Sequence, residues 1–292
     1  MVNIQKLTKR EQINYLLTNR IPRRWLTFFV GWLSQIENPL LTKFLIWGWS
    51  LFAEDLRLQD AKKQHFSSLG DCFTRELKDG LRPITADPDI VTSPCDAIVG
   101  AFGQVRGTEV FQAKGFPYEI SELIPNLHIN HKYRNGVFIT LRLKSSMYHR
   151  FHAPVDCNVS KVSYISGDTW NVNPVALKRV EKLFCKNERA VIELKTGHPT
   201  NSITLVPVAA ILVASMKFKF LSQILDLKYK GPNDIACDAQ FKKGDEMGYF
   251  QHGSTIILFA TNNYSFCEGI ETGKAIKMGQ ALLSGHSDLS TL

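Results

Sequence analysis

Two short segments of the sequence contain residues that could carry out covalent or acid–base chemistry. The first is the chain's single Gly-Ser dipeptide, Gly253-Ser254, at the end of a glycine-punctuated run that begins at Lys243. By itself this run predicts a turn that leads into a strand. The second is the pair His149 and His152, which form an HxxH motif. The pair could be half of a metal site or two histidines at the edge of a strand, and no second cluster of metal-ligand residues follows nearby in the sequence.

The usual signatures of several other enzyme classes are absent from the sequence. It contains no GxSxG, GxGxxG, P-loop or HExxH motif, so the common hydrolase, nucleotide-binding and metalloprotease interpretations have no motif to support them. The six cysteines are scattered without a CxxC pair, which favours separate buried thiols in a reducing compartment. With 44% hydrophobic and 21% charged residues, the composition is that of an ordinary globular protein.

The N-terminal part that precedes these residues is basic and rich in tryptophan. The chain has a net charge of +8, which favours an anionic partner. Residues 1–43 hold seven of the basic side chains and only two acidic ones. Apolar residues recur there at the spacing of one helical face. This stripe consists of Trp25, Phe28, Phe29, Trp32, Leu33 and Ile36. Asn38-Pro39 predicts the end of the helix, and a second apolar stretch, Phe44–Ala53, follows.

These two apolar segments are too short to cross a membrane, since a spanning helix needs about 20 apolar residues. The first 20 residues are polar and do not fit a signal peptide. The pattern favours a helix that lies in the membrane interface, with aromatic side chains inserted and Arg23 and Arg24 among the lipid phosphates. The alternative is a pair of core helices packed on the main domain.

The remainder of the chain reads as strands. From Leu81 onward, short runs rich in Val, Ile and Phe are separated by Gly, Pro, Asn and Asp. Examples are Gly136–Leu143, Ala190–Leu194, Ile203–Met216 and Ser254–Ala260. Because Pro207 interrupts the third run, we expect two buried strands there. The predicted fold class is therefore α+β, with N-terminal amphipathic helices followed by a mainly antiparallel β domain.

Taken together, several motifs resemble those of the phosphatidylserine decarboxylase family, in its bacterial membrane-associated branch. The resemblance runs in one colinear order from the N-terminal helices to about residue 280. The matching runs are Ser93–Asp96 (SPxD), Tyr148–Pro154 (YHRxHxP), Lys243–Phe250 (KGxExGxF) with Gly253-Ser254-Thr255, Arg75 with Leu81–Ile84, Gln112–Gly115, and Asn187–Arg189.

The resemblance implies that the chain cleaves itself between Gly253 and Ser254. In this family the serine attacks the preceding carbonyl, and the resulting ester is eliminated to leave a pyruvoyl group. A serine hydroxyl needs a base and an orienting carboxylate, and the resemblance assigns these roles to His152 and Asp96. The expected products are a β chain of residues 1–253 and an α chain of residues 254–292.

The reaction and its partners also follow from the resemblance. The pyruvoyl group made from Ser254 is the expected cofactor and Schiff-base centre, and it decarboxylates phosphatidylserine to phosphatidylethanolamine in phospholipid biosynthesis. His149 matches the family histidine assigned to substrate handling and decarboxylation. No metal and no nucleic acid are expected. The expected membrane-binding residues are Trp25, Phe28, Phe29, Trp32, Arg23 and Arg24.

The resemblance further implies a homodimer of the cleaved chains, peripheral on the cytoplasmic face of the bacterial inner membrane. We expect residues 1–75 to form the membrane-associating helical region and residues 76–292 the β-rich decarboxylase domain. The chain departs from the family pattern at His252 (usually Leu), at Ala97 (usually Gly) and at Ser145-Ser146-Met147 (usually Pro-Arg-Asp). Two alternatives remain, a self-cleaving relative that acts on another amine-bearing acid and a non-enzymatic membrane-binding homologue.

Overall fold

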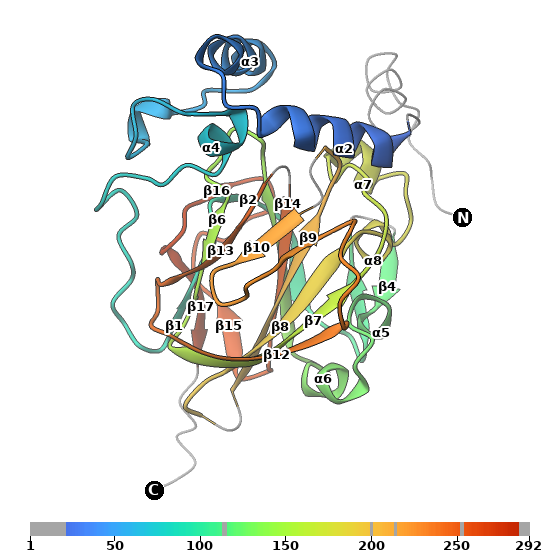
Figure 1. The fold of residues 1–292 in the computed structure, drawn as a ribbon. Helices are drawn as coiled ribbons and strands as arrows, with labels where there is room; N and C mark the ends of the chain where they lie inside the picture. Colours follow the sequence, from blue (N-terminus) through green and yellow to red (C-terminus); the bar gives the residue numbers. More distant parts are fainter. Residues whose placement is uncertain (1–21, 113–115, 199–200, 213–214, 252–253, 286–292) are drawn as a thin grey trace, which may run out of the picture.

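An eight-stranded antiparallel sheet forms the centre of the protein (Figure 1). The computed structural model describes residues 22–112, 116–198, 201–212, 215–251 and 254–285. The strand order of the sheet is β12-β7-β8-β9-β14-β5-β2-β16. In chain order these strands are β2 (Ala97–Gln104), β5 (Val137–Leu143), β7 (Cys157–Ile165), β8 (Arg189–Lys195), β9 (Ser202–Ala209), β12 (Asp234–Phe241), β14 (Ser254–Ala260) and β16 (Ala275–Ile276).

Strand β14 lies in the middle of this sheet and is buried along its whole length. Ile256 and Leu258 point into a core on one face, while Ile257 and Phe259 point into a second core on the other face. Burial on both faces explains why the strand is an almost continuous apolar run instead of an alternating one.

A second, four-stranded sheet covers the first of these faces. Its order is β11 (Ile224–Asp226), β10 (Ser215–Phe218), β13 (Glu246–Phe250) and β6 (Arg150–His152). Phe151, Phe218 and Phe250 extend from it into the shared core, where the ring of Phe151 contacts the rings of the other two. There are two smaller sheets. One has three strands in the order β1 (Ile90–Thr92), β17 (Ala281–Gly285) and β15 (Tyr264–Phe266), and the other pairs β3 (Glu109–Phe111) with β4 (Pro117–Glu119).

Four short helices contribute to the second core, and the sequence analysis did not predict them. They are α5 (Ile120–Leu123), α6 (Leu127–Lys132), α7 (Pro174–Leu177) and α8 (Leu183–Lys186). Each is one or two turns long, which is too short to show the periodicity that identifies a helix in a sequence.

The N-terminal helices α2 (Arg23–Ser34) and α3 (Pro39–Phe52) lie with α4 (Leu69–Phe73) at one end of the molecule (Figure 1). A 3₁₀ turn, η1 (Leu58–Asp60), follows α3. Asn38 caps α3 by accepting hydrogen bonds from the amides of Leu40 and Leu41, and Pro39 occupies the first turn. The Asn38-Pro39 pair thus starts the second helix as well as separating it from the first. No described helix is long and apolar enough to span a membrane.

The predicted α+β class is confirmed, with two corrections of detail. Ile203–Met216 does contain two strands, but Pro207 lies inside β9 opposite Ile256 and does not separate them. On the other side of β9, the pairing with β8 includes Val208 and Leu205 but not the two residues between them. Pro207, which has no amide hydrogen to donate, lies in this gap in the pairing. All six cysteines are free thiols, but only Cys72, Cys95 and Cys157 are buried.

Candidate active site

Ser254 is the first residue of β14 and is held from both sides by the central sheet. It lies opposite Leu143 of β5 and Ala209 of β9. The residue is fully buried, and its Oγ has no hydrogen-bond partner among the described residues. A buried hydroxyl without a hydrogen-bond partner costs free energy, so such a group in a folded protein needs an explanation, and a catalytic role is one. Gly253 and His252 lie outside the described residues.

His152 ends β6, and its ring is fixed by two hydrogen bonds. Nδ1 lies 2.8 Å from the carbonyl oxygen of Gly244, and Nε2 lies 3.0 Å from the hydroxyl of Tyr148. Because a carbonyl can only accept, Nδ1 carries the proton and Nε2 accepts from Tyr148. Burial is the main effect on the ring and lowers the pKa of His152 below its usual value, partly offset by the bond to Gly244. The neutral ring is the form that can act as a base.

Two glycines of the KGxExGxF run account for this arrangement. Gly244 has a φ of +91°, which glycine adopts without strain, and its carbonyl accepts the His152 proton. A Cβ on Gly248 would lie 2.2 Å from the carbonyl oxygen of Lys217, so only glycine permits the close approach of β10 and β13.

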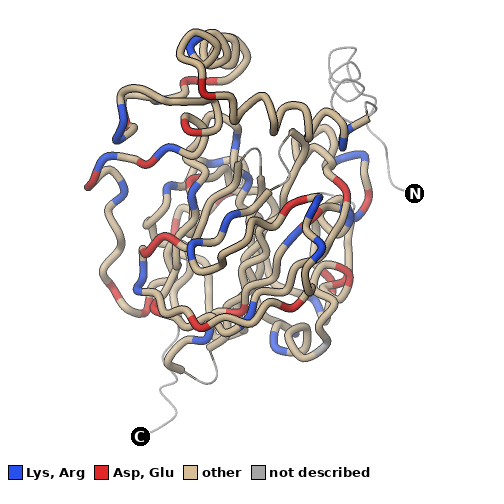
Figure 2. Tube along the Cα trace, in the orientation of Figure 1, with Lys and Arg blue, Asp and Glu red and all other residues tan. Residues whose placement is uncertain are grey.

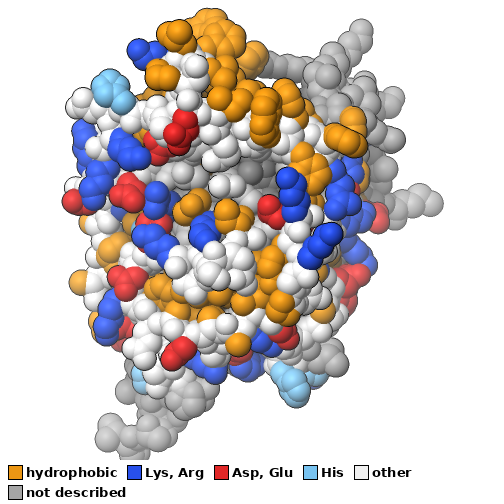
Figure 3. Space-filling view, viewed as in Figure 1, with side chains coloured by type: hydrophobic (Ala, Val, Ile, Leu, Met, Phe, Trp, Pro, Cys, Tyr) orange, Lys and Arg blue, Asp and Glu red, His pale blue; other side chains and the backbone are white. Residues whose placement is uncertain are grey.

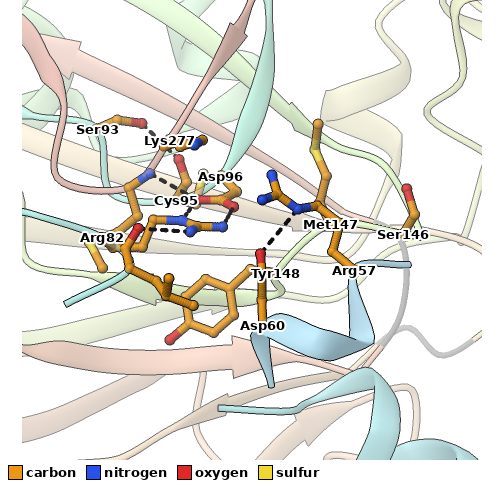
Figure 4. A network of polar contacts seen from close by, with 12 residues as sticks. Arg57, Asp60, Arg82, Ser93, Cys95, Asp96, Ser146, Met147, Tyr148 and Lys277 are labelled. Atoms are coloured by element: carbon orange, nitrogen blue, oxygen red, sulfur yellow. Dashed lines mark hydrogen bonds and ion pairs between the residues drawn. The ribbon is translucent and has the colours of Figure 1, made fainter. Parts of the chain in front are cut away.

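Asp96 does not contact His152 in the structure. Its two carboxylate oxygens accept hydrogen bonds from Nε and Nη2 of the Arg82 guanidinium (Figure 4). The backbone amide of Met278 donates a further hydrogen bond to Asp96 at 3.0 Å. Both side chains of the ion pair are about nine-tenths buried. The expected carboxylate partner of the base is therefore paired with an arginine, and a backbone carbonyl orients His152 instead.

The SPxD run reaches His152 through the backbone. The amide of His152 donates to the carbonyl of Pro94 at 2.8 Å, two residues before Asp96. β6 also pairs with β13, where His152 lies opposite Glu246. The structure thus brings the SPxD, YHRxHxP and KGxExGxF runs into contact, and the last of these leads along the chain to Ser254.

His149 is fully buried just before β6. Its Nε2 donates to the carbonyl of Lys144 at 2.9 Å, and its own carbonyl accepts from the amide of Phe250 at 3.0 Å. Phe250 is four residues before Ser254. The ring of Phe73 lies against the His149 ring, with centroids 4.1 Å apart.

The Asn187-Glu188-Arg189 run supports the strand beside Ser254. Asn187 donates to the carbonyl of Ala209, and the carbonyl of Glu188 accepts from the amide of Ala209. Because Ala209 is the β9 partner of Ser254, these bonds fix the position of the serine. Glu188 is itself fully buried, and its carboxylate accepts from the hydroxyl of Tyr164.

Three residues at the site were not assigned a role from the sequence, namely Arg82, Tyr148 and Gly244. All three lie within runs that resemble the family pattern, and this location was the only sign in the sequence that they could belong to the site. A pattern of residue types does not say which side chains pair. Among the described residues, no group of three or more His, Cys, Asp or Glu side chains could hold a metal ion. The Oγ of Ser254, buried and without a hydrogen-bond partner among the described residues, fits conversion of this residue into a pyruvoyl group.

The outer surface of α2 and α3 is apolar. Trp25 is 78% exposed and Trp32 63% exposed, while Thr27 and Ser34 face the protein. Helix α3 adds further exposed residues, of which all but Leu40 lie in the predicted second apolar stretch: Leu40, Phe44, Trp47, Leu51 and Phe52. Figure 3 shows these side chains as a continuous hydrophobic area, and Figure 2 shows few charges along both helices.

The two arginines at the start of α2 differ in their surroundings. Arg24 is exposed. Arg23 forms a 2.6 Å ion pair with Asp168, and its guanidinium lies over the ring of Trp170. These contacts anchor the start of α2 to the body of the protein.

The sequence is similar to proteins of one family along most of its length. Residues 69–284 match the family model described as phosphatidylserine decarboxylase. A phosphatidylserine decarboxylase proenzyme from Vibrio campbellii is 34% identical over 270 residues, which are 89% of this chain and 94% of the relative. Proenzymes of the same name from Shewanella putrefaciens (33% identical, 93% of this chain and 97% of the relative) and Brevibacillus brevis (34% identical, 78% and 82%) are also similar.

Proposed function

Because this chain belongs to the phosphatidylserine decarboxylase family, we propose that it cleaves itself before Ser254 and then converts phosphatidylserine to phosphatidylethanolamine and CO2. It is an enzyme of the carboxy-lyase class. The observation that carries the proposal is the buried hydroxyl of Ser254 at the start of β14, which has no hydrogen-bond partner among the described residues. Strand β14 follows β13 along the chain, and β13 pairs with the strand β6 that carries His152.

Self-cleavage is a rearrangement within the chain followed by hydrolysis. Ser254 Oγ attacks the carbonyl carbon of residue 253, the peptide C–N bond breaks, and an ester forms with a free amine on residue 254. Loss of the Cα proton of residue 254 then expels the carboxylate of residue 253 and leaves a carbon–carbon double bond. Water adds, ammonia leaves, and a ketone remains at the start of the 254–292 fragment.

His152 is the group that accepts the serine proton in this proposal. Its pKa is lowered by burial, so the ring is neutral near pH 7. Tyr148 donates to Nε2, the nitrogen that accepts protons. Self-cleavage therefore requires this hydroxyl either to move away from Nε2 or to pass the serine proton to it.

His149 serves the second reaction. The pyruvoyl group supplies an electrophilic carbonyl and an electron sink for loss of CO2. Nε2 of His149 donates a hydrogen bond to the carbonyl of Lys144. This bond leaves Nδ1 as the ring nitrogen that we propose faces the reaction. We assign it to substrate orientation and to proton delivery at the carbon that loses CO2.

The exposed aromatic residues of α2 and α3 form the proposed membrane-binding surface. Apolar insertion and basic residues such as Arg24 together suit an interface helix on an anionic leaflet. The enzyme would then be peripheral on the cytoplasmic face of the cell membrane, and its cleaved chains would form a homodimer.

The proposal is tested by conversion of phosphatidylserine in vesicles, followed by mass spectrometry of the lipids. The expected result is phosphatidylethanolamine from the wild type, none from Ser254→Ala, and strong loss from His149→Ala with self-cleavage retained. His152→Ala and Asp96→Asn should impair self-cleavage itself. A cleaved wild-type protein that leaves phosphatidylserine unchanged but decarboxylates another amine-bearing acid would favour the alternative substrate.

A further inference from the structure

Three aromatic rings connect the surface helix α3 to His149. The indole of Trp49 stacks on Phe73, with centroids 5.5 Å apart and planes at 30°. Phe73 lies in turn against His149, with centroids 4.1 Å apart and planes at 30°. The three rings come from three separate segments, α3, α4 and the residues before β6. Phe73 and His149 are almost completely buried.

Trp49 lies on the opposite side of α3 from the exposed surface. Residues 47 and 49 are separated by about 200° around a helix. Accordingly, Trp47 is 58% exposed, whereas Trp49 is half-buried against Phe73. A single helix therefore presents one aromatic face outward and one ring to the residue behind His149.

Both surface helices bear on α4, the five-residue helix that carries Phe73. Thr42 of α3 donates to the carbonyl of Ser67, and Ser68 caps α4 by accepting from the amide of Asp71. The end of α2 packs against Gly70, where a Cβ would lie 2.7 Å from Gln35 Nε2 and 3.1 Å from the Ser34 carbonyl oxygen. A shift of α2 or α3 thus reaches α4 through close contacts.

We infer that Trp49 and Phe73 are positioning residues that set the orientation of the His149 ring and transmit the docking of α3 on a lipid surface to it. This inference rests on the proposed function for the role of His149. Nε2 donates to the Lys144 carbonyl, and the Phe73 ring lies against the His149 ring, so a displacement of Phe73 would change the position of the His149 ring. Docked helices would hold the stack closed, and His149 would be oriented when the enzyme is on its substrate membrane.

The first test measures His149 without any need for activity. The uncut Ser254→Ala protein is labelled with ¹³C-histidine, and the ring signal of His149 is recorded with and without nanodiscs of phosphatidylcholine and phosphatidylglycerol. We expect the discs to shift this signal in the Ser254→Ala protein and to leave it unshifted in the double variant that also carries Trp49→Leu. In the double variant that carries Trp49→Phe instead, which keeps an aromatic ring, the discs should shift the signal as in the parent. Trp49→Met replaces Trp49→Leu if the latter does not fold.

The control is Phe220→Leu. It removes the middle ring of another series of three contacting rings, Phe218–Phe220–Phe241, which meet edge to face in the body of the protein. Its disc-induced His149 shift should equal that of the parent. A His149 shift that persists in disc-bound Trp49→Leu, or that is absent from the parent, would overturn the inference.

The second test uses the cleaved enzyme on phosphatidylserine vesicles. Because misplacement of a reacting group costs about ten- to a hundred-fold in rate, Trp49→Leu should lower kcat by about that factor, with KM and self-cleavage unchanged. A merely structural role would lower self-cleavage and kcat together and would resemble loss of stability. If the wild type fails to decarboxylate, the proposed function is wrong, while the histidine signal still decides the coupling.

Discussion

His152 is oriented by a backbone carbonyl, and this changes what Asp96 contributes. Arg82 engages both oxygens of the Asp96 carboxylate, while Gly244 fixes the tautomer of the histidine. Asp96 can still affect His152, because the Pro94 carbonyl of the same run accepts the His152 amide proton. Removal of one member of a buried ion pair leaves the other charge unpaired and costs about 3–5 kcal/mol. Asp96→Asn would therefore displace the segment that contains Pro94, and with it the carbonyl that accepts the hydrogen bond from the His152 amide.

The first prediction at the residue scale concerns the pH dependence of self-cleavage. Burial lowers the pKa of His152 in the folded protein below the ordinary value of about 6.5. The ring stays neutral, and competent as a base, at pH values where an exposed histidine is already protonated. We expect the cleavage rate of newly synthesised chain to become half-maximal only at a pH below about 6.5. A rate that is half-maximal above pH 6.5 would contradict the assignment.

The same pKa also determines a stability effect. The unfolded chain binds a proton at His152 more readily than the folded chain does, so this histidine contributes stability at neutral pH. That contribution is lost as the pH falls below the ordinary value.

The second residue-scale prediction concerns Glu188, whose pKa is raised by burial from 4.5 to about 7. For an acid, this means that the folded state favours the protonated form, so stability is lost as the pH rises from about 4.5 through about 7. This pKa difference corresponds to about 3 kcal/mol. Glu188→Gln keeps an acceptor for Tyr164 without the charge. In urea unfolding on the uncut Ser254→Ala background, it should stabilise the protein at pH 8 and leave it nearly unchanged at pH 5.

Equal effects of Glu188→Gln at the two pH values would show that the carboxyl group does not change its protonation state between them, and would contradict this prediction. Tyr164→Phe offers a separate check. It removes the hydroxyl that donates to Glu188 and should destabilise the protein at pH 8 more than at pH 5.

At the scale of elements, the sequence predicts what repeats and misses what is short. The apolar stripe from Trp25 to Ile36 identified α2, and the Val, Ile and Phe runs identified β5, β8, β9 and β14. Helices α5 to α8 are too short for periodicity. Pro207 was misjudged because its tolerance depends on an interruption in the neighbouring ladder, which is a property of the assembled sheet. The outward direction of the α2 stripe also needed the structure, since an amphipathic helix can equally bury that face.

The prediction for these elements concerns membrane binding. Trp25, Phe29 and Trp32 expose 78%, 55% and 63% of their surface, so replacing them by serine removes little internal packing. Each large apolar side chain withdrawn from an interface weakens binding by about 1.5–3 kcal/mol. Binding of the triple variant to anionic vesicles in a flotation assay should therefore fall by a factor of at least about a thousand.

In the triple variant, activity on a short-chain soluble phosphatidylserine should match that of the wild type. Ser254 and His152 lie on the β sheets, His149 lies just before β6, and none of them lies on α2. Ile224→Ser, at an exposed position on β11, is the control and should bind vesicles normally. If the triple variant loses activity equally on soluble and membrane substrates, these residues stabilise the fold and do not bind lipid.

At the scale of the whole molecule, the motifs identify the segments of the site but not their pairing. The SPxD, YHRxHxP and KGxExGxF runs are up to about 160 residues apart in the chain, and β6, β13 and the Pro94 carbonyl bring them together. The sequence indicated the runs that we propose to carry the chemistry, and the structure brings these runs together. It could not show that Arg82 forms an ion pair with Asp96, or that the Tyr148 hydroxyl donates a hydrogen bond to Nε2 of His152. These are outcomes of long-range packing, which residue types alone do not determine.

The central claim is that Ser254 becomes the first residue of a second chain, and the mass of the purified protein under denaturing conditions tests it most directly. The 33.0 kDa chain should be recovered as two fragments, residues 1–253 and 254–292, and the smaller should begin with a blocked, carbonyl-bearing residue that reacts with hydroxylamine. Ser254→Ala should remain a single chain under the same conditions. An intact wild-type chain after prolonged incubation at neutral pH, or a smaller fragment that begins with an ordinary serine, would contradict the account.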